Sequence, residues 1–149
     1  GSTLAVLLVR HTDDGSLAIG AYVGDSRIYF MRGGRLFCLT QDHTVVQRMV
    51  DDGVLTPQQA FEHPQAHVLT RALGHAAAVA VDLTSWTLLE PGDLFLLCSD
   101  GLSGYAADDD IRRTLAHEEP PEAVARRLLD LALREQIQDN ISALVVRAA

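Results

Sequence analysis

The sequence DLFLLCSDGLSG, residues 93–104, decides the fold of this chain. Its apolar run, residues 94–98, follows Pro91-Gly92-Asp93 and ends at Ser99. An unbroken apolar run this short, bounded by turn residues, predicts a strand that is buried on both faces. The end of the strand brings the carboxylate of Asp100 to the rim of a core, and Gly101 then allows a sharp turn or the close approach of a bound group. Taken alone, an Asp-Gly pair in this place is typical of an ordinary turn.

The composition is that of one globular domain covering residues 1–149. A chain of 149 residues can bury roughly 68–70% of its unfolded surface, and 48% of the residues are hydrophobic. No apolar stretch approaches the roughly 20 residues that cross a bilayer, and the first residues lack the features of a signal peptide, so we expect a cytoplasmic protein without a membrane partner. The net charge of −8, with arginine supplying all twelve basic residues, argues against a nucleic-acid groove.

Alternating apolar residues and turn signals predict strands on both sides of the central run. Four strands joined by tight turns predict an antiparallel meander, and we expect them at residues 4–11, 17–23, 27–31 and 35–39. Residues 78–89 are rich in strand formers, and residues 141–146 form the last strand. Cys38 and Cys98 both lie inside these apolar runs, which indicates buried free thiols and no disulfide.

Helix signals separate the two groups of strands. One helix starts at Thr44 and ends at Gly53, and a second starts with Thr56 as N-cap and Pro57 in the first turn. Two more helices begin at residues 108–110 and 120–122, where acidic residues suit the positive end of the helix dipole. The order of strands, helices and strands predicts an α+β layered domain.

Three aspartates lie where strands start or finish: Asp25, Asp100 and Asp139. Strand ends on one side of a packed sheet converge, so carboxylates far apart in the sequence can share one pocket. Carboxylate oxygens are the ligands that Mg²⁺ and Mn²⁺ prefer, and without a metal at least one of three converging carboxylates would hold a proton. Each aspartate also has a plain structural explanation, because Asp residues cap turns and Asp25 can pair with Arg27.

The chain resembles the PP2C-type metal-dependent protein serine/threonine phosphatases, the PPM family. Five blocks in the family's order carry this resemblance, and they are residues 21–29 (AYVGDSRIY), 39–43 (LTQDH), 69–74 (LTRALG), 91–102 (PGDLFLLCSDGL) and 139–142 (DNIS).

The resemblance implies a fold, a cofactor and a reaction. The fold is an antiparallel β-sandwich flanked by helices, and the cofactor is Mn²⁺ or Mg²⁺. In the family, the aspartates that match Asp100 and Asp139 are ligands of the metal centre, and the one that matches Asp25 belongs to a further, weaker site shared with Asp100. Metal-activated water hydrolyses phosphoserine and phosphothreonine in a phosphorylated protein substrate, so no protein nucleophile is needed.

The resemblance begins after the family's first third. The family's Asp-Gly-X-Gly-Gly motif does not occur in the sequence, and Asp14-Gly15-Ser16 lies in a predicted hairpin turn. We therefore expect the C-terminal two-thirds of a phosphatase domain, without the N-terminal part, that turns over poorly by itself. Open sheet edges are expected to be covered by an N-terminal segment or by self-association. The alternative is a non-catalytic pseudophosphatase that serves as an interaction module, and the sequence does not identify substrate-binding residues.

Overall fold

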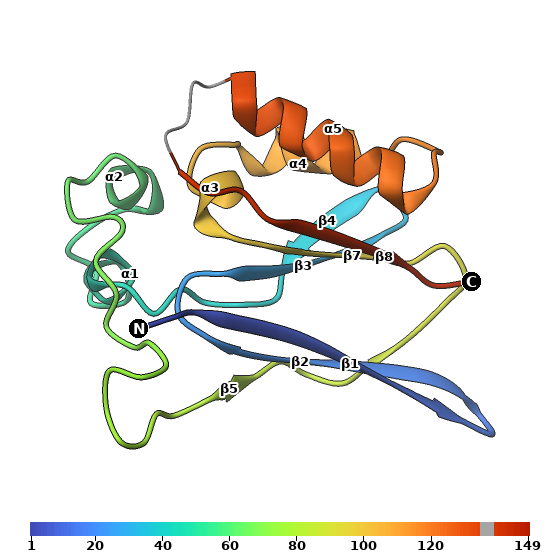
Figure 1. The fold of residues 1–149 in the computed structure, drawn as a ribbon, viewed down its shortest axis with the longest axis horizontal. Coiled ribbons are helices and arrows are strands. Elements are labelled where there is room, and N and C mark those ends of the chain that lie inside the picture. Colours follow the sequence, from blue (N-terminus) through green and yellow to red (C-terminus); the bar gives the residue numbers. More distant parts are fainter. Residues whose placement is uncertain (135–138) are drawn as a thin grey trace.

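Two antiparallel sheets packed face to face form the core of the computed structural model, which describes residues 1–134 and 139–149 (Figure 1). The strands of the first sheet are β1 (Leu4–Thr12), β2 (Gly15–Val23), β5 (Asp82–Leu83) and β6 (Thr87–Leu88). The strands of the second sheet, in spatial order, are β4 (Arg35–Cys38), β3 (Arg27–Arg32), β7 (Leu94–Cys98) and β8 (Ala143–Arg147). The expected sandwich is confirmed.

Strand β7 is the central strand that residues 93–104 predict. All five of its residues are buried, and it pairs with β3 on one side and β8 on the other. Its start is fixed by Asp93, which is 2% exposed and accepts hydrogen bonds from Arg32 Nε at 2.7 Å and from the Glu90 amide at 2.8 Å. The strand is held at its beginning by this buried ion pair, and it delivers Asp100 immediately after its end.

The expectation of one four-stranded meander is wrong, because the first four strands divide between the two sheets. Strands β1 and β2 form a hairpin, whereas β3 and β4 form another in the opposite sheet. The chain crosses between the sheets at residues 24–26, where Gly24 has a φ of 105°. A Cβ at this glycine would lie 2.3 Å from Thr3 Cγ2, so both the backbone conformation and the close approach require glycine.

The core has two layers. Between the sheets lie Ala18, Ile28, Phe30, Phe95 and Leu97. On the outer side of the second sheet, three helices cover the other face of β3, β7 and β8 (Figure 1). They are α3 (Asp100–Ser103), α4 (Asp108–Leu115) and α5 (Pro121–Arg134). Because β7 contributes residues to both layers, it is buried on both faces.

Two further helices, α1 (Val45–Asp51) and α2 (Pro57–Phe61), lie at one end of the sandwich (Figure 1). Thr44 caps α1 by accepting a hydrogen bond from the Gln47 amide, and Gly53 follows its C-cap with a φ of 72°. Thr56 and Gln59 form a capping box at the start of α2, with Pro57 in its first turn. These helix starts and the end of α1 agree with the sequence signals.

Residues 78–89 form less strand than their composition predicts. Only the short strands β5 and β6 pair with β2 there, and the residues between them form an irregular connection. Both cysteines are free, but only Cys98 is buried, because Cys38 lies on the edge strand β4. Within residues 1–134 and 139–149, no helix has the length and apolar character that crossing a membrane requires.

The outer face of the first sheet is apolar and exposed. It carries Leu4, Val6, Leu8, Leu83 and Leu88, all at least 43% exposed. Among the described residues no helix lies on this side, whereas α3, α4 and α5 cover the second sheet (Figure 1). The two sheets of the sandwich therefore differ in how their outer faces are covered.

The α5 layer gives a direct test of the fold. Leu128 on α5 is fully buried against the second sheet, and Leu133 on the same helix is 61% exposed. We predict that Leu128→Ala lowers the free energy of unfolding by about 2–5 kcal/mol, because the substitution leaves a cavity, whereas Leu133→Ala changes it by less than about 1 kcal/mol. Urea denaturation followed by circular dichroism measures both, and equal effects of the two substitutions would contradict the packing described here.

Candidate functional site

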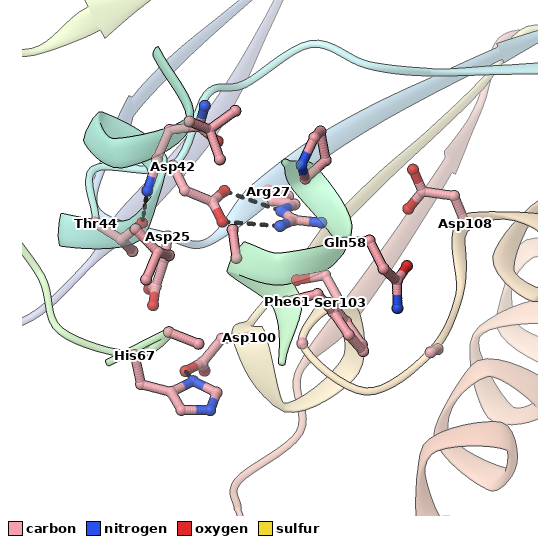
Figure 2. A pocket seen from close by; sticks show the side chains of 18 of the residues that line it. Asp25, Arg27, Asp42, Thr44, Gln58, Phe61, His67, Asp100, Ser103 and Asp108 are labelled. Atoms are coloured by element: carbon pink, nitrogen blue, oxygen red, sulfur yellow. Dashed lines mark hydrogen bonds and ion pairs between the residues drawn. The ribbon is translucent and has the colours of Figure 1, made fainter. Parts of the chain in front are cut away.

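A pocket of about 570 Å³ opens at the end of the sandwich where α1 and α2 face α3 (Figure 2). Its apolar wall comes mainly from the two short helices and includes Val46, Val50, Ala60 and Phe61. Its polar wall comes from residues near strand ends and helix starts and from the turn after α2, and includes Asp25, Arg27, Asp42, His67, Asp100 and Asp108. The pocket thus joins an apolar groove to a group of carboxylates.

Asp25 enters the pocket from the crossing between the sheets. It follows Gly24 directly and is only 8% exposed. The hydroxyl groups of the neighbouring Ser26 and of Thr3 form a hydrogen bond of 2.8 Å. Burial raises the pKa of Asp25 to about 6, and the nearby carboxylates of Asp100 and Asp42 add to this increase. Ionised Asp25 is therefore a buried negative charge that the surrounding side chains compensate incompletely.

Asp100 enters from the end of β7, as the first residue of the short helix α3. The chain needs glycine at position 101, because a Cβ there would lie 2.4 Å from the carbonyl oxygen of Asn140. Ser99 ties the same two segments together, since its hydroxyl donates to the Asn140 carbonyl at 3.2 Å and accepts from the Ser142 amide at 3.0 Å. The sequence predicted a turn after β7, and the structure has a helical turn packed against residues 140–142.

Asp139 lies in the loop that these contacts hold, but it does not line the pocket. It is exposed, and its Oδ1 accepts a hydrogen bond of 2.7 Å from the Asn140 amide. Of the three predicted aspartates, the structure thus brings Asp25 and Asp100 into one pocket and leaves the Asp139 carboxylate turned to its own backbone.

A divalent cation fits part of this arrangement. Asp25 and Asp100 offer carboxylate oxygens, which are suitable ligands for a hard cation such as Mg²⁺ or Mn²⁺. A bound cation would also stabilise the ionised form of the buried Asp25. In the described part of the chain, however, no group of three or more His, Cys, Asp or Glu side chains is arranged to hold an ion. Asp25 and Asp100 fit as ligands, and a complete coordination shell takes further oxygen atoms.

Arg27 does not pair with Asp25, although the two are close in sequence. Its guanidinium makes a two-point contact with Asp42, with distances of 2.9 and 2.8 Å, and also donates to the Tyr29 hydroxyl at 3.0 Å (Figure 2). The Tyr29 hydroxyl in turn donates to Asp108 at 3.0 Å. This chain of contacts links β3 to the first residue of α4, and each of the three guanidinium nitrogens of Arg27 donates one hydrogen bond within it.

His67 is a pocket residue that the sequence did not point to. Its Nδ1 lies 3.7 Å from Asp100 Oδ2 (Figure 2). Its ring stacks on Tyr105 with centroids 6.1 Å apart. No spacing within the sequence relates His67 to Asp100 or Tyr105, because the contact arises only when the segment after α2 folds over α3. Arg71, further along this segment, forms a salt bridge with Asp82.

The chain is similar in sequence and fold to known protein phosphatases. Residues 1–141 match the family model for protein phosphatase 2C. The serine/threonine protein phosphatase PstP of Mycobacterium tuberculosis is 39% identical over 146 residues, which are 97% of this chain and 27% of PstP. The structure of PppA from Pseudomonas aeruginosa has 40% sequence identity and a TM-score of 0.85, over 99% of this chain and 57% of PppA. The catalytic domain of PstP in complex with two manganese ions has 35% identity and a TM-score of 0.77, over 96% of this chain and 56% of that domain.

The sandwich fold is that of the PP2C-type phosphatases. The chain belongs to the protein phosphatase 2C family. It spans less than two-thirds of the length of these relatives.

The raised pKa of Asp25 predicts a stability that depends on pH. The pKa of this carboxyl group is 3.8 in the unfolded chain and about 6 in the folded chain. The free energy of unfolding therefore falls as the pH rises through this interval, because the unfolded chain ionises the group more readily. Asp25→Asn removes that loss, so in the metal-free protein we predict a gain of about 1–3 kcal/mol at pH 7.5 and almost none at pH 3.5.

Urea denaturation in EDTA at the two pH values measures this difference. Asp14→Asn, in the exposed turn between β1 and β2, is the matched control and should change stability little at either pH. A loss of stability in Asp25→Asn at pH 7.5, or a gain that is the same at both pH values, would contradict the assignment of Asp25 as a destabilising buried charge.

Proposed function

We propose that residues 1–149 are a single, partial PP2C-type domain of a metal-dependent protein serine/threonine phosphatase. The observation that supports this most is the pairing of Asp25 and Asp100, from two different sheet connections, in one pocket of a chain that belongs to the family. The substrate is a protein that carries phosphoserine or phosphothreonine. The net charge of −8 argues against nucleic acid as the partner.

In this proposal Asp25 and Asp100 hold Mn²⁺ or Mg²⁺, and Asp139 joins them when its side chain turns from the Asn140 amide. The bound metal supplies an activated water and neutralises charge on the phosphoryl group. The apolar wall with Phe61 borders the site of the reacting groups, and the Asp42 contact keeps Arg27 from acting as a free phosphate clamp.

Two candidate nucleophiles are unsuited to attack on phosphorus, which supports a reaction by water. The Ser99 hydroxyl is engaged in hydrogen bonds with the Asn140 carbonyl and the Ser142 amide. Cys98 is buried, and this burial raises the pKa of its thiol to about 12, so that the reactive thiolate is scarce near neutral pH.

Two further parts of the proposal concern the surroundings of the domain. The exposed apolar face of the first sheet is to be covered by a preceding segment of the phosphatase domain or by a second copy of the chain. We propose the cytoplasm as the location.

The second candidate function is a non-catalytic interaction module that keeps the phosphatase fold. One observation favours it: the described residues contain no group of three metal-ligating side chains around the pocket. In that case the pocket binds a phosphoprotein without hydrolysing it.

The test is hydrolysis of p-nitrophenyl phosphate and of a phosphothreonine peptide with and without Mn²⁺. We predict slow turnover by this chain, because the ions are held by too few ligands. A fusion to the family segment that carries the Asp-Gly-X-Gly-Gly motif should restore Mn²⁺-dependent turnover. Asp100→Asn should lower the activity of the fusion by at least about 10- to 100-fold, the range that follows even from loss of a ligand's supporting partner.

Asp14→Asn, which alters an exposed turn, should leave this activity unchanged. A folded fusion that hydrolyses neither substrate with Mn²⁺ or Mg²⁺ would contradict the phosphatase assignment and favour the interaction module. Full activity that survives Asp100→Asn would contradict the proposed metal site.

A further inference from the structure

His43 occupies a buried position one layer below the pocket. Its side chain is 4% exposed, and its ring stacks on Tyr22 of β2 with centroids 5.2 Å apart. Its side chain does not cap α1, because the next residue, Thr44, is the N-cap. Both ring nitrogens of His43 instead make hydrogen bonds to other parts of the chain.

The first ring contact reaches the residue before Asp25. The Gly24 amide donates to His43 Nδ1 at 3.0 Å, and the His43 amide donates to the Gly24 carbonyl at 2.9 Å. These two hydrogen bonds engage both the amide and the carbonyl group of Gly24. With the φ of 105° and the tight contact to Thr3, they fix the backbone from which the Asp25 side chain enters the pocket.

The second ring nitrogen contacts Asp82, the first residue of β5. Nδ1 accepts a hydrogen bond and so carries no proton, which leaves the proton on Nε2, and Nε2 donates to Asp82 Oδ2 at 3.0 Å. Asp82 is held by two bonds from Arg71, at 2.9 and 3.0 Å. Arg71 follows Thr70, whose amide donates to the His43 carbonyl at 2.7 Å.

We propose that His43 is a positioning residue that sets the placement of Asp25 and couples it to the Arg71–Asp82 ion pair. The imidazole acts through its tautomer: Asp82 keeps the proton on Nε2, and this leaves Nδ1 free to accept from Gly24. Arg71 and Asp82, which follow α2 in the chain, therefore influence the position of Asp25 without contacting it. The inference rests on the proposed metal site only where it concerns the binding of an ion by Asp25.

Two substitutions separate this role from simple packing. Asn at position 43 places an amide oxygen near the position of Nδ1 and keeps an acceptor for Gly24, whereas Gln places its amide nitrogen near Nε2 and keeps a donor for Asp82. Both remove the aromatic ring and lose its contact with Tyr22. A residue that only packs would respond alike to the two substitutions.

The experiment uses the ¹⁵N-labelled chain. We expect the amide-exchange protection of Gly24 to stay within about threefold of the unsubstituted chain in His43→Asn and to fall about tenfold or more in His43→Gln, as loss of one buried hydrogen bond implies. Paramagnetic broadening of the Asp25 amide during a titration with Mn²⁺ should weaken in the same order. Equal Gly24 protection in the two variants, or greater loss in His43→Asn, would overturn the inference.

A third variant tests the coupling where both His43 variants fail to fold. Asp82→Ala changes a side chain that is 41% exposed and leaves both Gly24 contacts possible. We expect it to lower Gly24 protection severalfold, because Nε2 loses the partner that fixes the tautomer, and unchanged protection would overturn the coupling. Lack of Mn²⁺ broadening in the unsubstituted chain would overturn the proposed metal site alone, since exchange of the Gly24 amide involves no metal.

Discussion

The complete burial of strand β7 is the constraint on which the rest of the structure depends. One face of Leu94–Cys98 packs against the first sheet and the other against the helices, so the strand must be apolar throughout and must begin and end at polar groups. The Arg32–Asp93 pair fixes the beginning. At the other end Asp100 is the first residue beyond the core, and Gly101 allows the loop of residues 139–142 to approach it. The same strand thus organises both core layers and presents one carboxylate of the site.

The second carboxylate illustrates a conflict between stability and function. Asp25 is buried beside Asp100 and Asp42, and its raised pKa shows that the fold disfavours its charge. The structure nonetheless holds Asp25 there through Gly24, whose conformation, contact with Thr3 and bonds to His43 leave the backbone little freedom. Asp42 forms a salt bridge with Arg27 at 2.8 Å, whereas the partner of Asp100 is His67, at the longer distance of 3.7 Å. Such incompletely compensated charge in a pocket is typical of functional sites.

The sequence predicted the parts of this structure that depend on local pattern. Most strand positions, the helix starts at Thr44 and Thr56, and the buried run of β7 follow from periodicity and turn residues. The assignment of the first four strands to two sheets did not, because a hairpin pattern does not specify which sheet each hairpin joins. Contacts across long sequence separations were also out of reach: His43 and Asp82 are 39 residues apart, and no local signal relates them. For the site, convergence of strand ends led to Asp25 and Asp100, whereas His67 required knowledge of how the segment after α2 folds.

In the proposed site, Asp25 and Asp100 together bind a divalent cation. The most direct measurement is anomalous diffraction from crystals of the protein grown with millimolar Mn²⁺, at the manganese absorption edge. We expect an anomalous-difference peak in the pocket about 2 Å from a carboxylate oxygen of Asp100, with Asp25 in the same coordination shell directly or through one water. Absence of a peak in this pocket, or manganese bound only at surface carboxylates such as Asp109 and Asp110, would contradict it.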